Sequence, residues 1–396
     1  MTSTKTSFLP TEILSEIVEY LYVLGIHDDL TKDNVPDRAL LQRQASLANF
    51  CLVNRQWYSA GIEYLYREPE VSQGNRFLQF TETLCPPPKT RQKTITNLKS
   101  MVRTLDLAKL VHQSSNSTTA RLISKTSKNL TWFRAPRVSF SLNGLASLTK
   151  CQNLRRLDLS RVGDSSITFP QLKKTVSKLG NLNDLSLPIY IPLTPTFLPN
   201  ITWPNSLHEL TIGGIIDHDL MQIFDWPTNL GTLRLSNCKN LDIYLIESIL
   251  DNEFMSENLH NFTINTNCME HYMHLDDSTA VLHSLDLLER LDIPSSLLRP
   301  LLLLDDEMSP IHLTIMVIDD EPAMTVNDSE FGADLMKSLE SGPLGKIWAL
   351  YVSRGFSDSY QLKPEEIDDL ILLHLDDVDD EELDEWGTRL GFYEDE

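Results

Sequence analysis

The sequence predicts an α/β protein that combines two architectures: a small all-helical module, then a curved solenoid with parallel strands. Two observations lead to this prediction. Amphipathic helical segments fill the first seventy residues, and a leucine frame then recurs at intervals of 23–29 residues from Val102 to Leu288. We therefore expect a helical module at 1–70, a solenoid at 71–355, and a capping helix with an acidic tail at 356–396.

The first helical segment is FLPTEILSEIVEYL. Its apolar residues recur three or four positions apart, which places them on one face of a helix. Pro10 stands where the first helical turn tolerates a missing N–H. Thr11 and Glu12 add polar and acidic character at the positive end of the helix dipole. A helix beginning near Pro10 is the expected result.

The second helical segment ends in LANFCLVNRQWYSAGIEYLYREPEV. It is amphipathic as well, and two short helices cannot bury so many apolar side chains between themselves. Part of this apolar surface is therefore expected to meet a partner. Leu52 and Leu65 are expected instead to hold the module together.

The motifs LPTEILxxIxxYL and LVNRxWYxxxxxxLYR, within residues 8–70, resemble an F-box of the fungal type. The connector between Tyr22 and Gln44 is longer and more polar than in most F-boxes. The resemblance implies docking on a Skp-type adaptor of a cullin–RING ubiquitin ligase. It also implies an adaptor-binding set, with Trp57 as its strongest member: Leu9, Pro10, Ile13, Leu14, Ile17, Leu21, Val53 and Trp57.

A short helix is predicted over Arg76–Cys85, because apolar residues recur there at helical spacing. The three prolines after Cys85 end it. A basic loop follows at Lys89–Thr96.

From Val102 the frame L-x-x-L-x-L repeats, and a period of 20–29 residues with this frame is typical of leucine-rich repeats. In each unit the leucines point into a shared core while the residues between them face outward. The irregular copies resemble the divergent repeats found behind fungal F-boxes. The first apolar positions are Val102, Leu130, Leu154, Leu182, Leu207, Leu230, Leu259 and Leu288.

Beyond Pro300 the frame weakens. PIHLTIMVID predicts another strand, and GKIWALYVSRGF predicts the last strand before the repeats stop. Gln361–Leu375 is predicted to be an amphipathic helix that covers the end of the solenoid. The acidic run Asp376–Glu385 follows it.

The outward strand positions are the predicted site for a protein substrate, because solenoids usually bind ligands on such a surface. Arg155, Arg156, Arg161 and Arg234 suggest an acidic or phosphorylated ligand segment as one hypothesis. The candidate substrate-binding residues are Arg156, Asp158, Ser160, Glu209, Thr211, Arg234, Asn261 and Thr263.

Charge is distributed unevenly along the chain. Residues 71–178 contain 19 Lys or Arg and 4 Asp or Glu, whereas residues 251–396 contain 7 and 35. The formal net charge of -22 argues against nucleic acid as a partner. No signal peptide or membrane span is apparent, and the five scattered cysteines favour reduced thiols. We therefore expect no membrane partner and a location in the cytoplasm or nucleus.

No catalytic signature stands out, and the prediction is a protein that is not an enzyme and needs no cofactor. Gly213-Gly214 lacks the spacing and the lysine of a phosphate loop and is interpreted as a turn. Cys268, His271 and His274 have helical spacing for zinc but no second ligand pair to complete a closed site.

The resemblance therefore implies a non-catalytic substrate-recognition subunit of an SCF-type ubiquitin ligase. The helical module would hold the Skp adaptor and, through it, cullin, and the repeats would hold an unknown protein substrate. One alternative is a leucine-rich scaffold without a ligase role. Another is a metal-dependent enzyme that uses Cys268, His271 and His274.

Overall fold

The structure is a computed structural model of the chain. It describes residues 9–23, 37–72, 75–86, 97–110, 115–163, 166–194, 201–216, 221–239, 241, 243–265, 282, 285–294, 297, 313–319, 329–342, 344, 347–353, 367, 371 and 390–393.

Two compact units make up the chain. The first contains Met1–Ile167 and Lys178–Leu182, and the second contains Thr168–Ser177 and Asn183–Glu396. The helical module and the first repeats therefore belong to one unit. The predicted domain boundaries at 70 and 355 do not coincide with this division.

Three helices build the N-terminal module: α1 (Thr11–Val23), α2 (Asp37–Leu52) and α3 (Arg55–Arg67). Their buried centre consists of Leu14, Val18, Leu47 and Phe50. The helices α1 and α3 run in the same direction. At their first ends Gln56 Nε2 donates to the Leu9 carbonyl at 2.5 Å, and at their last ends the rings of Tyr22 and Tyr64 lie 5.5 Å apart.

Asn54 separates α2 from α3, so the single apolar stretch in the sequence becomes two helices. Its side-chain oxygen accepts hydrogen bonds from the backbone N–H groups of Gln56, at 2.8 Å, and Trp57, at 3.1 Å. These N–H groups have no partner inside the helix, and Asn is a preferred residue for satisfying them. The chain therefore turns at Leu52–Asn54, which decides where the neighbouring apolar side chains point.

Tyr22 anchors the far end of α1. The guanidinium carbon of Arg43 lies 4.9 Å from the centre of its ring, and that of Arg67 lies 5.4 Å away. Arg43 also forms an ion pair with Glu68 at 3.5 Å. Burial, and secondarily the Glu68 carboxylate, raise the pKa of the Tyr22 hydroxyl, which therefore stays protonated over the physiological pH range.

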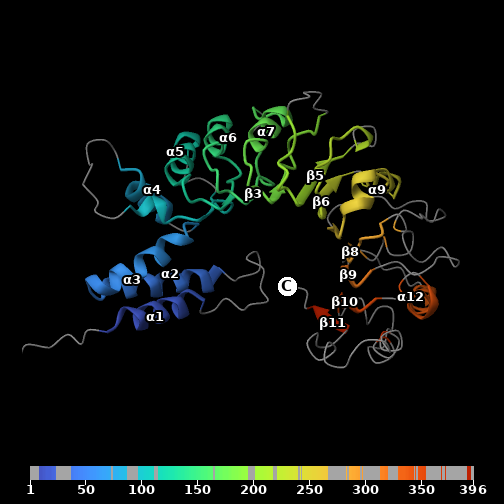
Figure 1. Ribbon diagram of the computed structural model, residues 1–396, viewed down its shortest axis with the longest axis horizontal. Helices are drawn as coiled ribbons and strands as arrows, with labels where there is room; N and C mark the ends of the chain where they lie inside the picture. The colour runs from blue at the N-terminus through green and yellow to red at the C-terminus, as the bar shows by residue number, and fades with distance from the viewer. Residues whose placement is uncertain are drawn as a thin grey trace, which may run out of the picture. The chain divides into compact units, whose positions relative to one another are not determined.

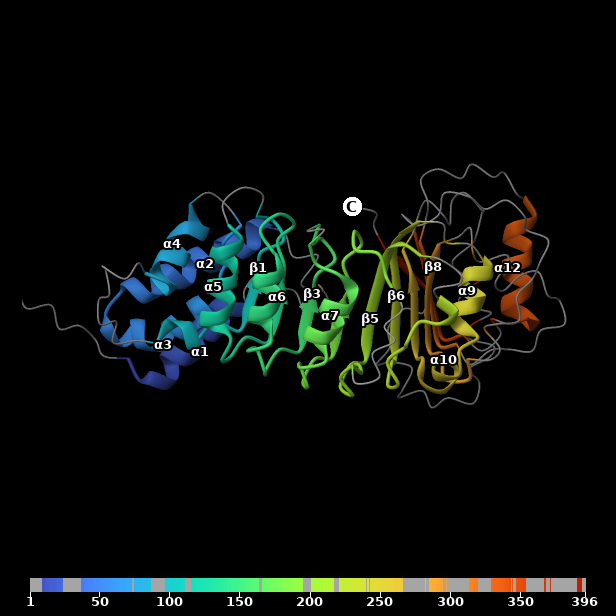
Figure 2. The same cartoon turned by 90° about the horizontal axis from the view of Figure 1, so that it is seen from above.

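The rest of the first unit begins the repeats. In chain order it contains α4 (Arg76–Leu84), the 3₁₀ turn η2 (Leu98–Ser100), β1 (Thr104–Asp106), α5 (Asn116–Thr126), β2 (Trp132–Arg134), α6 (Leu142–Leu148) and β3 (Arg156–Asp158). The three strands pair in parallel in that order. Figure 2 shows α5 and α6 together on one side of these strands. The predicted helix at Arg76–Cys85 is confirmed as α4.

The second unit continues the same pattern. Its elements are α7 (Phe169–Val176), β4 (Asp184–Ser186), β5 (Glu209–Ile215), β6 (Thr232–Lys239), α9 (Ile243–Leu250), α10 (Glu253–Asn258), β7 (Asn261–Ile264), β8 (Arg290–Pro294), β9 (Ile315–Asp319), α12 (Ser329–Ser341), β10 (Ala349–Ser353) and β11 (Leu390–Tyr393). Each strand from β4 to β11 pairs in parallel with the next. Within this unit the strands from β5 onward follow an arc (Figure 1).

The leucine frame predicts the strands correctly. Every one of the eight strands β1–β8 begins two residues after the first apolar position of its repeat. The second residue of each strand from β1 to β10 is buried and lies in register with its neighbour within the unit, as in Leu105–Phe133–Leu157 of the first unit. The second unit has the corresponding row Leu185, Leu210, Leu233, Phe262, Leu291, Met316 and Leu350. Leucine-rich repeats and parallel strands are therefore confirmed.

The C-terminal part differs from the expectation in one respect. β10 is not the last strand, because β11 pairs with it from within the predicted tail. Of the predicted helix Gln361–Leu375, only Ile367 and Ile371 are described, and both are buried. The acidic run Asp376–Glu385 lies outside the described residues.

Gly213 and Gly214 lie inside β5, not in a turn as the sequence suggested. The strand pairing shifts between Ile212 and Gly214, which marks a bulge, and Gly214 has a φ of 85°. A β-carbon on Gly214 would lie 2.1 Å from the carbonyl oxygen of Ile189. Glycine is therefore required here both by backbone conformation and by the close approach of another backbone segment.

Replacing Gly214 by alanine should destabilise the protein by at least about 2 kcal/mol, because left-handed backbone is unfavourable for alanine and the clash is with backbone. Urea unfolding of the full chain measures the change. The control is Gly180→Ala, since a β-carbon there meets nothing within 4 Å. That variant should stay within about 0.5 kcal/mol of wild type, and equal effects of the two changes would contradict the assignment.

Replacing Asn54 by alanine should cost about 1 kcal/mol of stability, because two N–H groups at the start of α3 lose their acceptor. Asn54→Asp keeps an acceptor and should unfold close to the wild-type urea concentration. If alanine and aspartate behaved alike, the capping role of Asn54 would be wrong.

Candidate protein-binding surfaces

An apolar surface lies at one end of the three-helix module, and we call it the apolar corner: Pro10, Ile13, Leu52 and Val53. Leu52 is 81% exposed, Val53 is 56% exposed and Ile13 is 41% exposed. Pro10 is exposed too. The hydrogen bond from Gln56 to Leu9 brings the first turn of α1 to the start of α3, next to the turn that carries Leu52 and Val53. Four apolar side chains therefore face solvent at the same end of the module.

The remaining residues predicted to bind the adaptor are partly or fully buried in the module. Leu9, Ile17, Leu21 and Trp57 are partly buried and pack against the module's centre. The Trp57 ring lies 4.7 Å from that of Phe50. Leu14 is fully buried, so its side chain is part of the core and is not at the surface.

Leu52 is the residue that the sequence interpretation misplaced. It was expected to hold the module together, whereas its side chain is the most exposed of the large apolar residues that are described. Leu65 does pack against the core as expected. The signal that was missed is Asn54, a preferred first cap of a helix, because a cap at that position makes Leu52 the end of the preceding helix.

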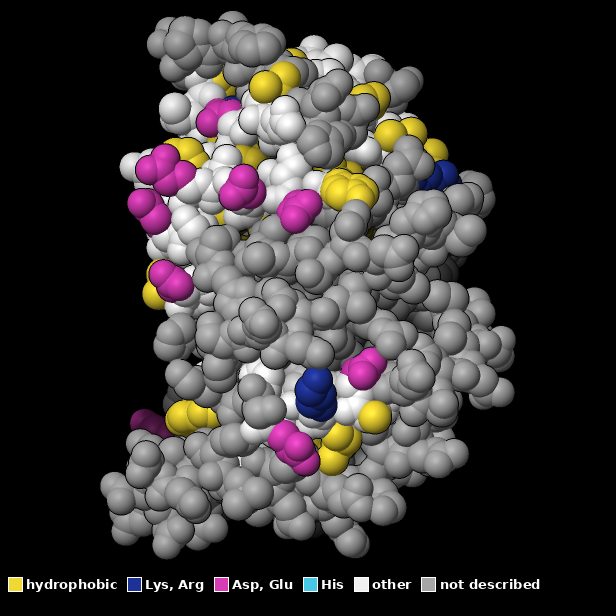
Figure 3. Space-filling view, turned by 90° about the vertical axis from the view of Figure 1, so that its right-hand side faces the viewer, with side chains coloured by type: hydrophobic (Ala, Val, Ile, Leu, Met, Phe, Trp, Pro, Cys, Tyr) yellow, Lys and Arg dark blue, Asp and Glu magenta, His cyan; other side chains and the backbone are white. Residues whose placement is uncertain are grey.

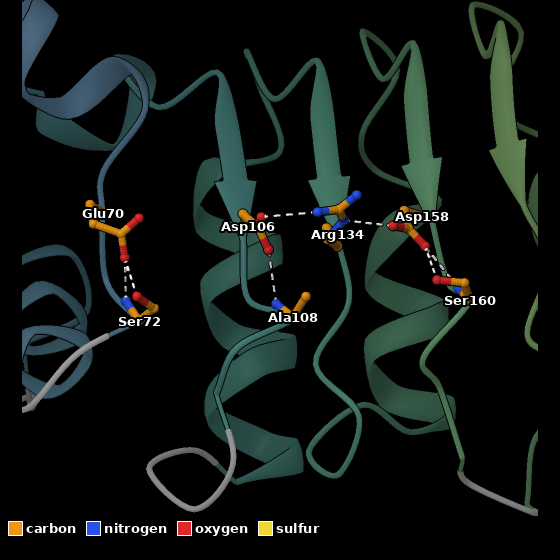
Figure 4. A network of polar contacts seen from close by, with 7 residues as sticks. All are labelled: Glu70, Ser72, Asp106, Ala108, Arg134, Asp158 and Ser160. Atoms are coloured by element: carbon orange, nitrogen blue, oxygen red, sulfur yellow. Dashed lines mark hydrogen bonds and ion pairs between the residues drawn. The ribbon is translucent and has the colours of Figure 1, made fainter. Parts of the chain in front are cut away.

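The second candidate surface is formed by the outward side chains of the strands. In the first unit, register aligns Thr104 with Trp132 and Arg156 in one row, and Asp106 with Arg134 and Asp158 in another. Because side chains alternate along a strand, both rows lie on the face opposite to the buried middle residues. Figure 4 shows the second row.

Arg134 connects this row. Its Nε donates to Asp158 Oδ2 at 2.6 Å, and its Nη1 lies 3.5 Å from Asp106 Oδ2. Each carboxylate also accepts a backbone N–H two residues further on, from Ala108 and Ser160, both at 2.9 Å. The Ser160 hydroxyl donates to Asp158 at 2.6 Å. The single cation therefore bridges two anions on the surface and balances one of their two charges (Figure 4).

Burial raises the pKa of Asp106 despite this neighbourhood. The Ala108 N–H and the Arg134 guanidinium act in the opposite direction, while Asp158 and Glu70 add to the rise. Arg134 itself was not among the predicted site residues. Its repeat, NLTWFRAPRV, matches the frame weakly, but Arg134 occupies the outward position that Asp158 occupies in the next repeat.

The second unit pairs its charges in a similar way. Arg234 Nη1 lies 2.8 Å from Glu209 Oε2 on the neighbouring strand. Arg290 Nε lies 2.9 Å from Asp292 Oδ1, and Thr263 Oγ1 donates to Asp292 Oδ2 at 3.4 Å. Asn261 Nδ2 donates to Thr232 Oγ1 at 3.1 Å.

The outward positions then change character towards the C-terminus. β9 and β10 carry Ile315, Val317, Ala349 and Tyr351, all half-buried, where earlier strands carry polar residues. The predicted Thr211 lies between Ser186 and Arg234 in its row. The strand face of this unit thus offers hydrogen-bonding groups at one end and apolar side chains at the other.

Neither surface has the composition of a metal centre. Within the described ranges, no group of three or more His, Cys, Asp or Glu side chains is placed to hold a metal ion. Cys268, His271 and His274 fall outside those ranges. A search of the same described residues for a helix long and apolar enough to cross a bilayer finds none.

Comparison with known proteins gives two sequence relatives. A Saccharomyces cerevisiae protein named F-box protein YDR306C is 29% identical over 242 residues, which are 61% of this chain and 48% of that protein. A Schizosaccharomyces pombe protein named Protein pof5 is 24% identical over 196 residues, which are 50% of this chain and 53% of that protein. The chain thus spans about half the length of these curated relatives. No protein-family model matches the chain.

Among solved structures, the leucine-rich repeat-containing protein LegL7 from Legionella pneumophila is similar at a TM-score of 0.41 and 16% identity. The match covers 70% of this chain and 92% of that one.

The F-box motifs of the sequence now stand beside a matching three-helix module, a ladder of parallel strands in register with the leucine frame, and a relative named as an F-box protein. The resemblance is confirmed: this chain is similar to F-box proteins, and its fold is that of leucine-rich repeats.

Proposed function

We propose that the chain is a non-catalytic substrate-recognition subunit of an SCF-type cullin–RING ubiquitin ligase. In this proposal the F-box module binds a Skp-type adaptor and, through it, cullin, while the repeats bind a protein substrate. The observation that carries the proposal is the apolar corner, where Leu52 and Val53 are exposed beside Ile13. A role in the cytoplasm or nucleus is part of the same proposal.

The energetic argument rests on apolar burial. Fully burying a leucine or valine side chain contributes about 1.5–3 kcal/mol. Leu52 and Val53 are adjacent in the chain and held rigidly by the Asn54 cap, so little conformational entropy would be lost when a partner covers them. An exposed, preorganised apolar surface of this kind is typical of protein–protein interfaces.

Trp57 has a supporting part in this proposal. Its ring packs on Phe50, so truncating it would loosen the turn that presents Leu52 and Val53 as well as remove any direct contact. Loss of adaptor binding in a Trp57→Ala variant would therefore not separate folding from binding. The exposed residues of the corner are the sharper probes.

For the substrate we propose the outward face of the strands, including Arg156, Asp158, Ser160, Glu209, Thr211, Arg234, Asn261 and Thr263. Arg234 is already paired with Glu209, and Asp158 with Arg134. A substrate on this face would gain more from hydrogen bonds and from the apolar positions at β9 and β10 than from any single charge. The chain would act by proximity, holding its cargo near a conjugating enzyme that other subunits carry.

Replacing Leu52 and Val53 together by aspartate should reduce co-purification of the Skp adaptor at least roughly tenfold, because a charge would have to be buried in the interface. The measurement is adaptor capture by the purified full chain. Val138→Asp/Leu142→Asp is the matched control, since these residues are 64% and 39% exposed on another part of the same unit. Unchanged capture by the corner variant, with normal circular dichroism, would refute the proposed adaptor site.

A second experiment separates the receptor from a leucine-rich scaffold, which is the alternative function. Capture of adaptor and cullin together, with partners that accumulate when the chain is deleted, is the expected result for a receptor. Capture of adaptor without cullin, and partners whose abundance does not change on deletion, would instead establish the scaffold.

A further inference from the structure

Positive charge gathers on the helical side of the first repeats, away from the strand face. Five side chains there form what we call the basic helix face: Lys99, Arg121, Lys125, Lys128 and Lys150. Lys99 lies in η2, Arg121 and Lys125 lie in α5, Lys128 follows α5, and Lys150 follows α6. All but the half-buried Lys99 are exposed.

Packing brings these side chains together. The helices α4 and α6 and the turn η2 all pack against α5. Arg121 and Lys125 are four residues apart, so they share one face of α5. Arg121 hydrogen-bonds to the Cys85 thiol, and Lys99 and Lys125 lie close enough to act electrostatically on the same thiol. Lys150 Nζ donates to Ser124 Oγ at 3.1 Å, which places Lys150 beside α5 next to Lys125.

These cations lack a counter-charge, in contrast to five arginines elsewhere in the described residues. Arg43, Arg103, Arg134, Arg234 and Arg290 each form an ion pair with Asp or Glu. Within the described part of the chain, none of the five residues of the basic helix face forms one. Between residues 76 and 150 the sequence contains only two acids, Glu82 and Asp106, and Asp106 lies on the strand face.

The helices of the later repeats carry negative charge instead. α9 and α10 and the turn between them carry Glu247, Asp251, Glu253 and Glu257. The view in Figure 3, onto the side where α9 and α12 lie in Figure 1, shows acidic side chains and few basic ones among the described residues. The basic helix face is therefore a local feature and not a general property of the solenoid's helices.

We propose that the basic helix face binds an acidic segment of the protein substrate. This inference rests on the proposed function only in calling the bound protein a substrate. Lys and Arg that lack counter-charges attract carboxylates and steer an acidic segment towards the surface. α5 is about 16 Å long at 1.5 Å per residue, so an extended segment of about five residues spans it. This proposal places an acidic ligand on the helical side, whereas the hypothesis from the sequence placed one at the strand-side arginines.

A protein segment fits this surface better than a nucleic acid. Among the described residues around the five cations, no exposed aromatic side chain is present on which bases would stack. A long polyanion would also extend beyond the basic helix face and be repelled by the rest of this chain, whose formal net charge is -22. A short acidic segment would not extend that far.

The test is fluorescence anisotropy of labelled decaglutamate with the full chain at about 50 mM salt, where exposed charges are weakly screened. Arg121→Gln/Lys125→Gln/Lys150→Gln should weaken binding roughly tenfold. The control, Arg155→Gln/Arg161→Gln/Lys239→Gln, removes the same charge from exposed positions around β3 and β6 and should bind nearly as wild type. Lys125→Arg/Lys150→Arg should retain binding.

Three results would overturn the proposal: no binding of decaglutamate by wild type, equal or greater loss in the control variant, or tighter binding of a single-stranded RNA of about twenty nucleotides that the first variant abolishes. The variant Leu52→Asp/Val53→Asp separates the two proposals. This variant should no longer capture the adaptor but should still bind decaglutamate. Failure of the wild-type chain to capture the adaptor would refute the proposed function without changing the result for peptide binding.

Discussion

The burial of one apolar residue from each strand against its neighbours is the interaction on which the structure depends. A single repeat cannot cover its own apolar side, so Leu105, Phe133 and Leu157 form one row in the first unit, and Leu185 to Leu350 form another in the second. Register between neighbours is set by these rows, since a slip of one residue would turn them to solvent. The same register aligns every outward side chain.

In the three-helix module, helix capping and the proposed adaptor site are linked through one residue. Asn54 satisfies the first N–H groups of α3, and in doing so it ends α2 at Leu52. Leu52 and Val53 stand at this turn beside Ile13 and leave the module with an apolar corner. A local backbone requirement therefore creates the surface to which we assign adaptor binding.

Charge is treated differently on the two sides of the repeats. On the strand face, neighbouring outward positions are close, and opposite charges meet across strands, as Arg134 does with Asp158 and Arg234 with Glu209. On the helical side, the helices of the first repeats bring like charges together. Coulomb repulsion between them is tolerable in water, where it is weak, but it leaves a surface that an acidic segment would complete.

The leucine frame by itself determined the fold class and the position of eight strands, because strand alternation and the need for a shared core leave little choice. It also placed Asp158, Glu209 and Arg234 on the outward face. The pairing of Arg134, the bulge between β5 and β6 and the strand β11 were decided only by tertiary structure. Each depends on a contact with residues distant in the sequence, which a repeat pattern does not encode.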